Sequence, residues 1–347
     1  MLREVSAHVD WCEMTMSMMR EKQFEACERR LFAHPSAALF AEEATEAEAQ
    51  ALYEHSFDAS PAQGGQELIT LAQLRERVMA RLPVEALYLS EGEIQLLEKL
   101  MINDGSLLLG DWDDIGAAEA LVSRLWCSFR ADGDNWTLLL PQALVEPLLN
   151  AMNTSEANMA RELLFRYDAT IHGLLYIAGL LHCAQPISFF LRDVMHREDL
   201  EAHQIARRYL QATFEYVTDA SGDLILLHPG LADPYHLVSR RENDSIFTLE
   251  ISQEMIAGGM NGILPEELSL HEAMCGALLG ALRPEYELGD SAEDLRMLAK
   301  QGVSYDEMES VMTSMLAVLP TENMKNALLE LYLRTPHWMG MKSTLEH

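Results

Sequence analysis

Apolar residues recur every three or four positions along most of the chain, a spacing typical of amphipathic helices. One such helix is predicted over 67–81, and we expect Pro83 to end it. Serine followed three residues later by glutamate, as at Ser90 and Ser304, predicts a capping box at the start of a helix. The same periodicity predicts further helices over 40–53, 116–126, 142–152, 158–167, 187–195, 199–209, 268–282, 292–301, 304–319 and 321–333.

Two stretches depart from the helical pattern and predict β-hairpins. The first, over 128–140, folds around Asp132 and Gly133, and the second, over 214–227, folds around another glycine-containing turn. Each hairpin follows a pair of helices and precedes a proline, which is the order of a winged-helix module. The expected fold class is mainly α with small β-hairpins (α+β), with two winged-helix-like modules flanked by helical N- and C-terminal regions.

This pattern divides the chain into four segments. The predicted order is a helical N-terminal region (1–88), a winged-helix-like module 1 (89–155), a winged-helix-like module 2 (156–257) and a C-terminal helical region (258–344). We expect residues 345–347 to be the remnant of an expression tag.

The charge balance narrows the range of partners. The chain carries 55 Asp and Glu against 25 Lys and Arg, a formal net charge of −30. A charge of this size repels nucleic-acid backbones and anionic membranes unless the basic side chains gather on one face. Solubility is the first explanation of the charge, and a surface for a basic protein partner is the second. Without an apolar span, a signal sequence or a C-x-x-C pair among its five cysteines, the chain is predicted to be cytoplasmic, with reduced thiols and no membrane association.

Nucleic-acid binding is the natural hypothesis for a winged helix, because its second helix can enter the major groove. In module 1 that helix carries Arg124 beside Glu119, a pairing that disfavours contact with phosphate. The arginines of module 2 can instead pair with neighbouring carboxylates such as Asp199. The candidate nucleic-acid contacts are therefore confined to module 2: Arg197, Arg207, Arg208, Arg240 and Arg241.

No motif predicts a catalytic residue, a metal ligand set or a cofactor. His271 and Cys275 have a helical i, i+4 spacing, but two ligands are only half of a metal site. Cys183 follows His182 directly, and adjacent side chains of a helix or strand point apart. The glycines of 258–262 lack the Lys-Ser/Thr of a phosphate-binding loop. We therefore expect a protein that is not an enzyme.

Three segments carry a resemblance to a known group of proteins. They are 171–176 (Ile-His-Gly-Leu-Leu-Tyr), 226–234 (Leu-Leu-His-Pro-Gly-Leu-Ala-Asp-Pro) and 333–338 (Leu-Arg-Thr-Pro-His-Trp). In these segments the chain resembles uncharacterised proteins of Firmicutes and other gut bacteria, many of which carry a C-terminal SEC-C zinc motif. The resemblance implies the architecture rather than an activity. No cysteine cluster follows Trp338 in this sequence, so it supplies no zinc ligands here.

The leading hypothesis is a non-catalytic protein-interaction or regulatory scaffold with an unidentified protein partner, which the charge suggests is basic. The alternative is a nucleic-acid-binding transcriptional regulator that acts through module 2.

Overall fold

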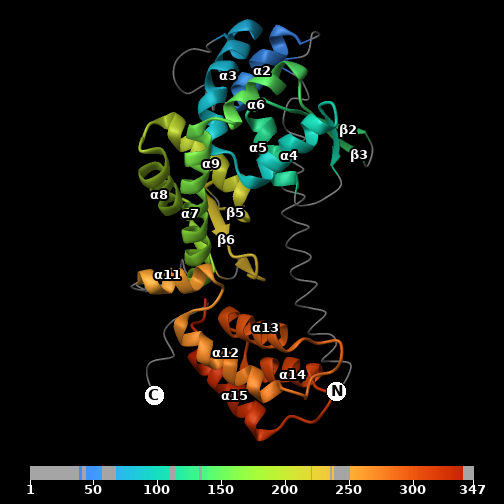
Figure 1. Cartoon of the computed structure of the whole chain (residues 1–347), viewed down its shortest axis with the longest axis vertical. Coiled ribbons are helices and arrows are strands. Elements are labelled where there is room, and N and C mark those ends of the chain that lie inside the picture. Colours follow the sequence, from blue (N-terminus) through green and yellow to red (C-terminus); the bar gives the residue numbers. More distant parts are fainter. Residues whose placement is uncertain are drawn as a thin grey trace. The chain divides into compact units, whose positions relative to one another are not determined.

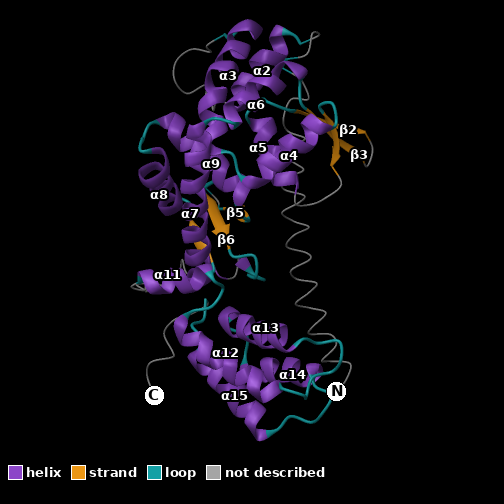
Figure 2. Cartoon of the chain, viewed as in Figure 1, coloured by secondary structure: helices purple, strands orange, loops and turns teal. Residues whose placement is uncertain are grey.

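The computed structural model describes residues 39–40, 44–56, 68–109, 114–132, 135–219, 221–234, 237 and 251–338. These residues are mainly helical and form two small three-stranded antiparallel sheets, as expected for the coarse fold class (Figure 2). Contacts divide the chain into two units. Among the described residues, unit 1 consists of Asp168–His182 and the part from Ile225 onward, and unit 2 of the part up to Tyr167 and Cys183–Leu224. The finer division into four segments stays a prediction.

Unit 2 is mainly helical, and its part up to α6 is packed around one leucine-rich core. The described helices that lie wholly within unit 2 are α2 (Glu46–Ser56), α3 (Leu71–Glu85), α4 (Glu91–Ile102), α5 (Asp114–Ser123), α6 (Gln142–Met152), α8 (Ala184–Phe189) and α9 (Leu200–Thr213), with a short 3-10 turn at Ala86–Tyr88 and a π-helical turn at Phe190–Met195 (Figure 1). The core includes Leu97, Leu138 and Leu144, each fully buried. Burying leucines of this kind is the main source of stability for such a unit.

The helix starts in unit 2 follow the sequence closely. Ser90 caps α4 by accepting a hydrogen bond from the Glu93 N–H, while the Glu93 side chain accepts one from the Ser90 N–H, so this predicted capping box is confirmed. Pro83 does not end α3, and that prediction was wrong. The proline sits in the last turn, where losing one N–H donor is offset by burial of the neighbouring Leu82.

The first sheet contains the first predicted hairpin. Strands β2 (Ser128–Asp132) and β3 (Asn135–Leu139) pair in antiparallel register, and β1 (Ser106–Leu109) joins the other edge of β3, giving the order β1-β3-β2. Phe129 lies opposite Leu138, so the buried face of the hairpin meets the core.

Helix α7 (Ser155–Ala178) is longer than predicted. The sequence predicted a helix over 158–167, but a single helix of 24 residues continues to Ala178. Residues 168–170 contain neither proline nor glycine, so nothing in the backbone stops the helix there. Gly179, with a left-handed φ of 75°, ends it.

The second sheet contains the second predicted hairpin. It consists of β4 (Leu180–His182), β5 (Tyr216–Thr218) and β6 (Leu224–Leu227), in the order β4-β6-β5. In β6 every side chain is buried, and its partner β4 was not predicted because three residues are too short to show a period.

The C-terminal part of unit 1 is a bundle of helices. They are α11 (Gln253–Met260), α12 (Pro265–Leu278), α13 (Leu288–Gln301), α14 (Tyr305–Met315) and α15 (Glu322–Arg334) (Figure 1). Methionines fill much of the core, including Met274, Met308 and Met312. The capping box predicted at Ser304 is confirmed, but α14 ends at Met315 rather than at 319, because Leu316 is already extended.

None of the described helices is both long enough and apolar enough to cross a membrane.

Candidate functional site

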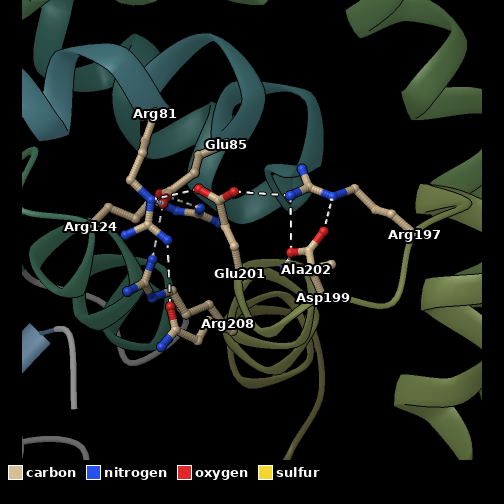
Figure 3. A network of polar contacts seen from close by, with 9 residues as sticks. Arg81, Glu85, Arg124, Arg197, Asp199, Glu201, Ala202 and Arg208 are labelled. Atoms are coloured by element: carbon tan, nitrogen blue, oxygen red, sulfur yellow. Dashed lines mark hydrogen bonds and ion pairs between the residues drawn. The ribbon is translucent and has the colours of Figure 1, made fainter. Parts of the chain in front are cut away.

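A network of arginines and carboxylates connects four helices of unit 2 (Figure 3). We call it the arginine network, and it consists of Arg81, Glu85, Glu93, Arg124, Arg197, Asp199, Glu201 and Arg208. Its members come from α3, from the start of α4, from the turn after α5, and from α9 with the residues just before it. It is the largest group of charged side chains that the described part of unit 2 brings together.

Glu85 is the centre of the buried half of this network. Its Oε2 accepts a hydrogen bond from Arg124 Nη1 at 3.1 Å, and its Oε1 accepts one from Arg208 Nη1 at 3.2 Å. Arg124 is also held from its other edge, where Nε donates to Glu93 Oε1 at 3.0 Å. Charge-assisted bonds of this kind are the strong class of hydrogen bond.

The outer half surrounds the N-terminus of α9. Glu201 lies between Arg81 and Arg197, 2.8 Å from Arg81 Nε and 3.0 Å from Arg197 Nη2 (Figure 3). Arg197 Nε also donates to Asp199 at 2.7 Å, and Asp199 caps α9 by accepting a hydrogen bond from the Ala202 N–H. The arginine therefore stabilises the cap of the helix that it precedes.

Burial sets the electrostatics of the inner half. The side chains of Arg124 and Glu93 are completely inaccessible to solvent. Burial alone would lower the pKa of Arg124, but attraction to Glu93 and Glu85 outweighs it and raises that pKa. Burial lowers the pKa of Arg208, and repulsion from Arg124 and Arg81 acts in the same direction against attraction to Glu85. The guanidinium groups are thus close enough to repel one another.

The structure gives different surroundings to the predicted nucleic-acid contacts. Arg197 and Arg208 belong to the arginine network, and the partner of Arg208 is Glu85 of α3 rather than a neighbouring carboxylate. Arg207 donates from Nη2 to the Gly222 carbonyl at 2.8 Å. Arg240 and Arg241 lie outside the described residues. Their role as nucleic-acid contacts stays a prediction.

A second buried charged group lies in unit 1, and we call it the Tyr176 cluster (Tyr176, His228, Glu267, Arg296, Lys300 and Trp338). Tyr176 Oη donates to Glu267 at 2.6 Å and accepts a hydrogen bond from Arg296. Lys300 forms an ion pair with Glu267 at 2.7 Å, with both side chains fully buried. Burial and the Glu267 carboxylate raise the pKa of the Tyr176 phenol, so it stays protonated and keeps donating.

Trp338 connects the Tyr176 cluster to the end of the described chain. Its indole Nε1 donates to the Tyr176 carbonyl at 3.0 Å, and its backbone N–H donates to the Lys300 carbonyl at 2.6 Å. The centroid of the His228 ring lies 5.0 Å from the centroid of the Trp338 ring. The three segments on which the sequence resemblance rests therefore meet at this cluster.

Burial lowers the pKa of Lys300 and lowers that of His228 to about 4. In His228, repulsion from Lys300 adds to the effect of burial. The Nδ1 atom of His228 accepts a hydrogen bond from the Gly230 N–H at 3.0 Å, which fixes the neutral ring. The polar groups of the cluster named here thus bind other residues of unit 1. The cluster therefore connects α7, α12, α13 and the end of the described chain.

The half-site suggested by His271 and Cys275 exists as a local contact, with Cys275 Sγ 3.6 Å from His271 Nε2. Burial raises the pKa of the Cys275 thiol, which does not favour the nucleophilic thiolate. Across the described residues, no group of three or more His, Cys, Asp and Glu is arranged to hold a metal ion.

Comparisons of the chain with protein-family models, with curated proteins and with solved structures found no match.

Sequence reasoning missed most of these residues, although a signal was present for some. In α13, Arg296 and Lys300 fall on the same face as the buried Ala292, Leu295 and Ala299. Charged residues at core positions of an amphipathic helix indicate buried partners. No such signal joins Glu85 to Arg208, because 123 residues separate them.

Proposed function

We propose that this protein is a non-catalytic interaction scaffold whose two winged-helix-like modules no longer offer a helix to DNA. The element order of module 2 supports the winged-helix interpretation: α7, β4, α8 and α9 precede the hairpin of β5 and β6, and β4 adds a third strand to it. Module 1 has the same strand arrangement, β1-β3-β2, with α5 before its hairpin.

The observation that carries the proposal is the enclosure of α5, the would-be recognition helix of module 1, and its packing against α9, that of module 2. Helices α5 and α9 pack against each other, and Gly116 of α5 lies beside the backbone of Gln211 in α9. Along α9 only Leu200 and His203 are exposed, and none of the described side chains of α5 is exposed. A helix that reads the major groove needs a free face. The described part of α5 has none, and one face of α9 is occupied by α5.

Binding DNA also requires basic side chains that are available to contact phosphate, and the arginine network engages two of the candidates. Arg197 and Arg208 are bound to carboxylates of the same unit, so contact with phosphate would have to break those ion pairs. Phosphate contacts supply most non-specific affinity for DNA. These observations support a scaffold over the alternative, a transcriptional regulator acting through module 2.

The charge of the C-terminal helices supports a basic protein as the partner. Residues 251–338 contain fourteen Asp and Glu and five Lys and Arg. Of these five, Arg296 and Lys300 are buried with Glu267, while Lys325 and Arg334 pair with Glu309 and Glu330. An excess of carboxylates on the surface attracts a basic surface and raises its association rate.

Two leucines mark where such a partner would bury apolar surface. Leu329 and Leu333 are one helical turn apart on α15, and 41% and 49% of their surfaces are exposed. Apolar residues rimmed by charge are typical of an interaction surface. The resemblance to the uncharacterised bacterial proteins with a SEC-C motif is part of this proposal, since it implies no activity.

A capture experiment with matched variants tests the scaffold. The wild-type chain, L329D/L333D and the control L200D, on exposed Leu200 of α9, would be immobilised and exposed to extract of the native host, with and without nuclease treatment. We expect one set of basic proteins to be retained by wild type and by L200D but not by L329D/L333D. Retention that all three share equally, or that disappears with nuclease treatment, would contradict the proposal.

A gel-shift experiment tests the alternative directly. The protein would be titrated onto random-sequence duplex DNA at about 50 mM salt, where phosphate contacts are strong. We expect no retardation. Retardation that R207Q reduces would instead support the regulator, because Arg207 lies outside the arginine network and is therefore free of that network's ion pairs.

A further inference from the structure

Three helices end on an asparagine that binds back to its own helix. Asn103, Asn153 and Asn261 follow α4, α6 and α11, and the side-chain amide of each donates to the carbonyl four residues earlier, at 2.7, 2.7 and 2.9 Å. All three residues are exposed, and their backbone angles are alike. The next residue is aspartate after Asn103, threonine after Asn153 and glycine after Asn261. The three helix ends therefore place the same cap beside three different neighbours.

The glycine after Asn261 leaves its own backbone nitrogen open to reaction. Asparagine is one of the thermolabile residues of proteins, and its side-chain carbonyl carbon can be attacked by the backbone nitrogen of the next residue. Glycine has no Cβ to shield that nitrogen. A Cβ added to Gly262 would meet nothing within 4 Å, so the structure leaves room for the ring that the attack forms. No other asparagine of the sequence is followed by glycine.

Two hydrogen bonds must open before the attack. The Gly262 N–H donates to the Gly259 carbonyl at 3.1 Å, and the Asn261 side chain is bound to the Ala257 carbonyl. Both bonds belong to the C-terminal end of α11, a helix of eight residues. Helix ends open locally at little cost in free energy, so these bonds slow the attack without preventing it.

We propose that Asn261 is a site of spontaneous deamidation, with water as the only co-reactant. A bond forms between the Gly262 nitrogen and Asn261 Cγ, the bond from Cγ to Nδ2 breaks, and the Gly262 N–H proton leaves with the amide nitrogen as ammonia. Water then opens the resulting succinimide at one of its two carbonyl carbons, which gives aspartate or isoaspartate. In total, one amide and one water become one carboxylate and one ammonium ion.

The product lacks the cap of α11. A carboxylate at position 261 cannot donate to the Ala257 carbonyl, and its charge lies at the negative end of the helix. Isoaspartate also lengthens the backbone before Gly262, whose carbonyl accepts a hydrogen bond from Arg296 Nη1 at 2.8 Å. Deamidation therefore weakens the end of α11 and its link to the Tyr176 cluster. This inference goes beyond the scaffold proposal and does not depend on it.

Ageing of the protein in solution tests the inference. The wild-type chain would be kept for several weeks at mildly alkaline pH, below its unfolding temperature. Digestion at acidic pH and fragmentation mass spectrometry would then locate each converted amide. We expect Asn261 to be converted at least tenfold faster than Asn103 and Asn153. Equal rates at the three caps, or no conversion of Asn261, would overturn the proposal.

Exchanging the following residues between two caps assigns the rate to the glycine. D104G gives Asn103 the neighbour of Asn261, and the left-handed φ of 53° at Asp104 suits glycine. G262D gives Asn261 the neighbour of Asn103, at a φ of 70° close to the one that Asp104 adopts. We expect D104G to speed the conversion of Asn103 and G262D to slow that of Asn261, each at least tenfold. An unchanged rate in either folded variant would overturn the role of Gly262, and D104G alone decides if G262D does not fold.

The loss of the cap is measured by the unfolding temperature during the same incubation. We expect the unfolding temperature of the wild type to fall as Asn261 is converted. N261Q is the control, because its longer side chain closes the ring far more slowly, and we expect a smaller fall. Equal falls in the two proteins would overturn the predicted weakening of α11.

Discussion

At the scale of single residues, the two buried charged groups show how a strongly acidic chain uses its few cations. Arg124 and Lys300 have side chains with no exposure to solvent, and each is next to carboxylates that are also buried. Taking a charge out of water is costly, and a partner left without its counter-ion destabilises a fold much more than the pair stabilises it. Removing one charged side chain from either group is therefore expected to lower the stability of the protein substantially.

Replacing Glu85 by glutamine is expected to lower the free energy of unfolding of unit 2 by about 3–5 kcal/mol, because Arg124 and Arg208 lose the carboxylate that they share. Urea denaturation of E85Q followed by circular dichroism measures the change. E91Q is the control, since exposed Glu91 on α4 contacts only the Gln95 side chain among the bonds described, and we expect a change of about 0.5 kcal/mol or less. Equal stability of the two variants would contradict the importance of Glu85.

His228 is expected to make the protein less stable in acid. Its folded pKa of about 4 lies below the ordinary value of 6.5, so the unfolded chain binds a proton first as the pH falls. The stability is complete above pH 6.5 and is lost between there and about pH 4, by up to about 3 kcal/mol. H228N, whose amide oxygen can replace Nδ1 as the acceptor from Gly230, is expected to lose less stability over this interval. Parallel pH profiles of unfolding for wild type and H228N would refute this assignment.

At the scale of secondary-structure elements, contact between helices depends on a few small residues. A Cβ added to Gly173 of α7 would lie 2.5 Å from the carbonyl oxygen of Ile256 in α11. Gly259 of α11 faces Gly173 in return, so the two backbones touch where these glycines meet. Gly276 of α12 is different, because an added Cβ there would meet nothing within 4 Å.

This contrast predicts opposite effects of the same substitution. G173A is expected to destabilise the protein by about 1–3 kcal/mol, because the backbone of α11 must shift to admit the methyl group. G276A is expected to stabilise it by about 0.5–1 kcal/mol, because alanine restricts the unfolded chain and favours the helix. Denaturant unfolding of both variants measures the difference. Destabilisation by G276A as large as by G173A would show that helix contact is not the cause.

The elements themselves were largely predictable, whereas their contacts were not. Local signals placed α6 at its observed bounds, both hairpins, and the capping boxes at Ser90 and Ser304, because each depends on residues a few positions apart. Pro83 and the middle of α7 misled the prediction, since packing overrode a weak local preference. The pairing of Arg208 with Glu85 is set by how α9 packs on α3, which no spacing along the chain records.

At the scale of the whole molecule, the net charge of −30 acts on every state of the chain. Like charges on a compact surface repel, and salt screens them over a distance of about 8–10 Å at 0.10–0.15 M. The buried ion pairs are shielded from salt by the protein around them, so screening relieves the surface repulsion more than it weakens those pairs.

Raising sodium chloride from about 20 mM to about 200 mM at pH 7.5 is therefore expected to increase the unfolding temperature by a few degrees. Differential scanning calorimetry measures the change. A decrease with sodium chloride would show that exposed ion pairs, rather than repulsion, dominate the surface.

The enclosure of α5 has a consequence for how this chain can change. Most helices of a small unit keep one side where substitutions accumulate at little cost, but none of the described side chains of α5 is exposed. In a library that replaces every residue of α5 and of α9 in turn, folded variants should therefore be rarer in α5 than in α9, where Leu200 and His203 are exposed and further residues are only partly buried. A new recognition function is expected to arise on elements other than α5, because a substitution in α5 first disturbs packed contacts.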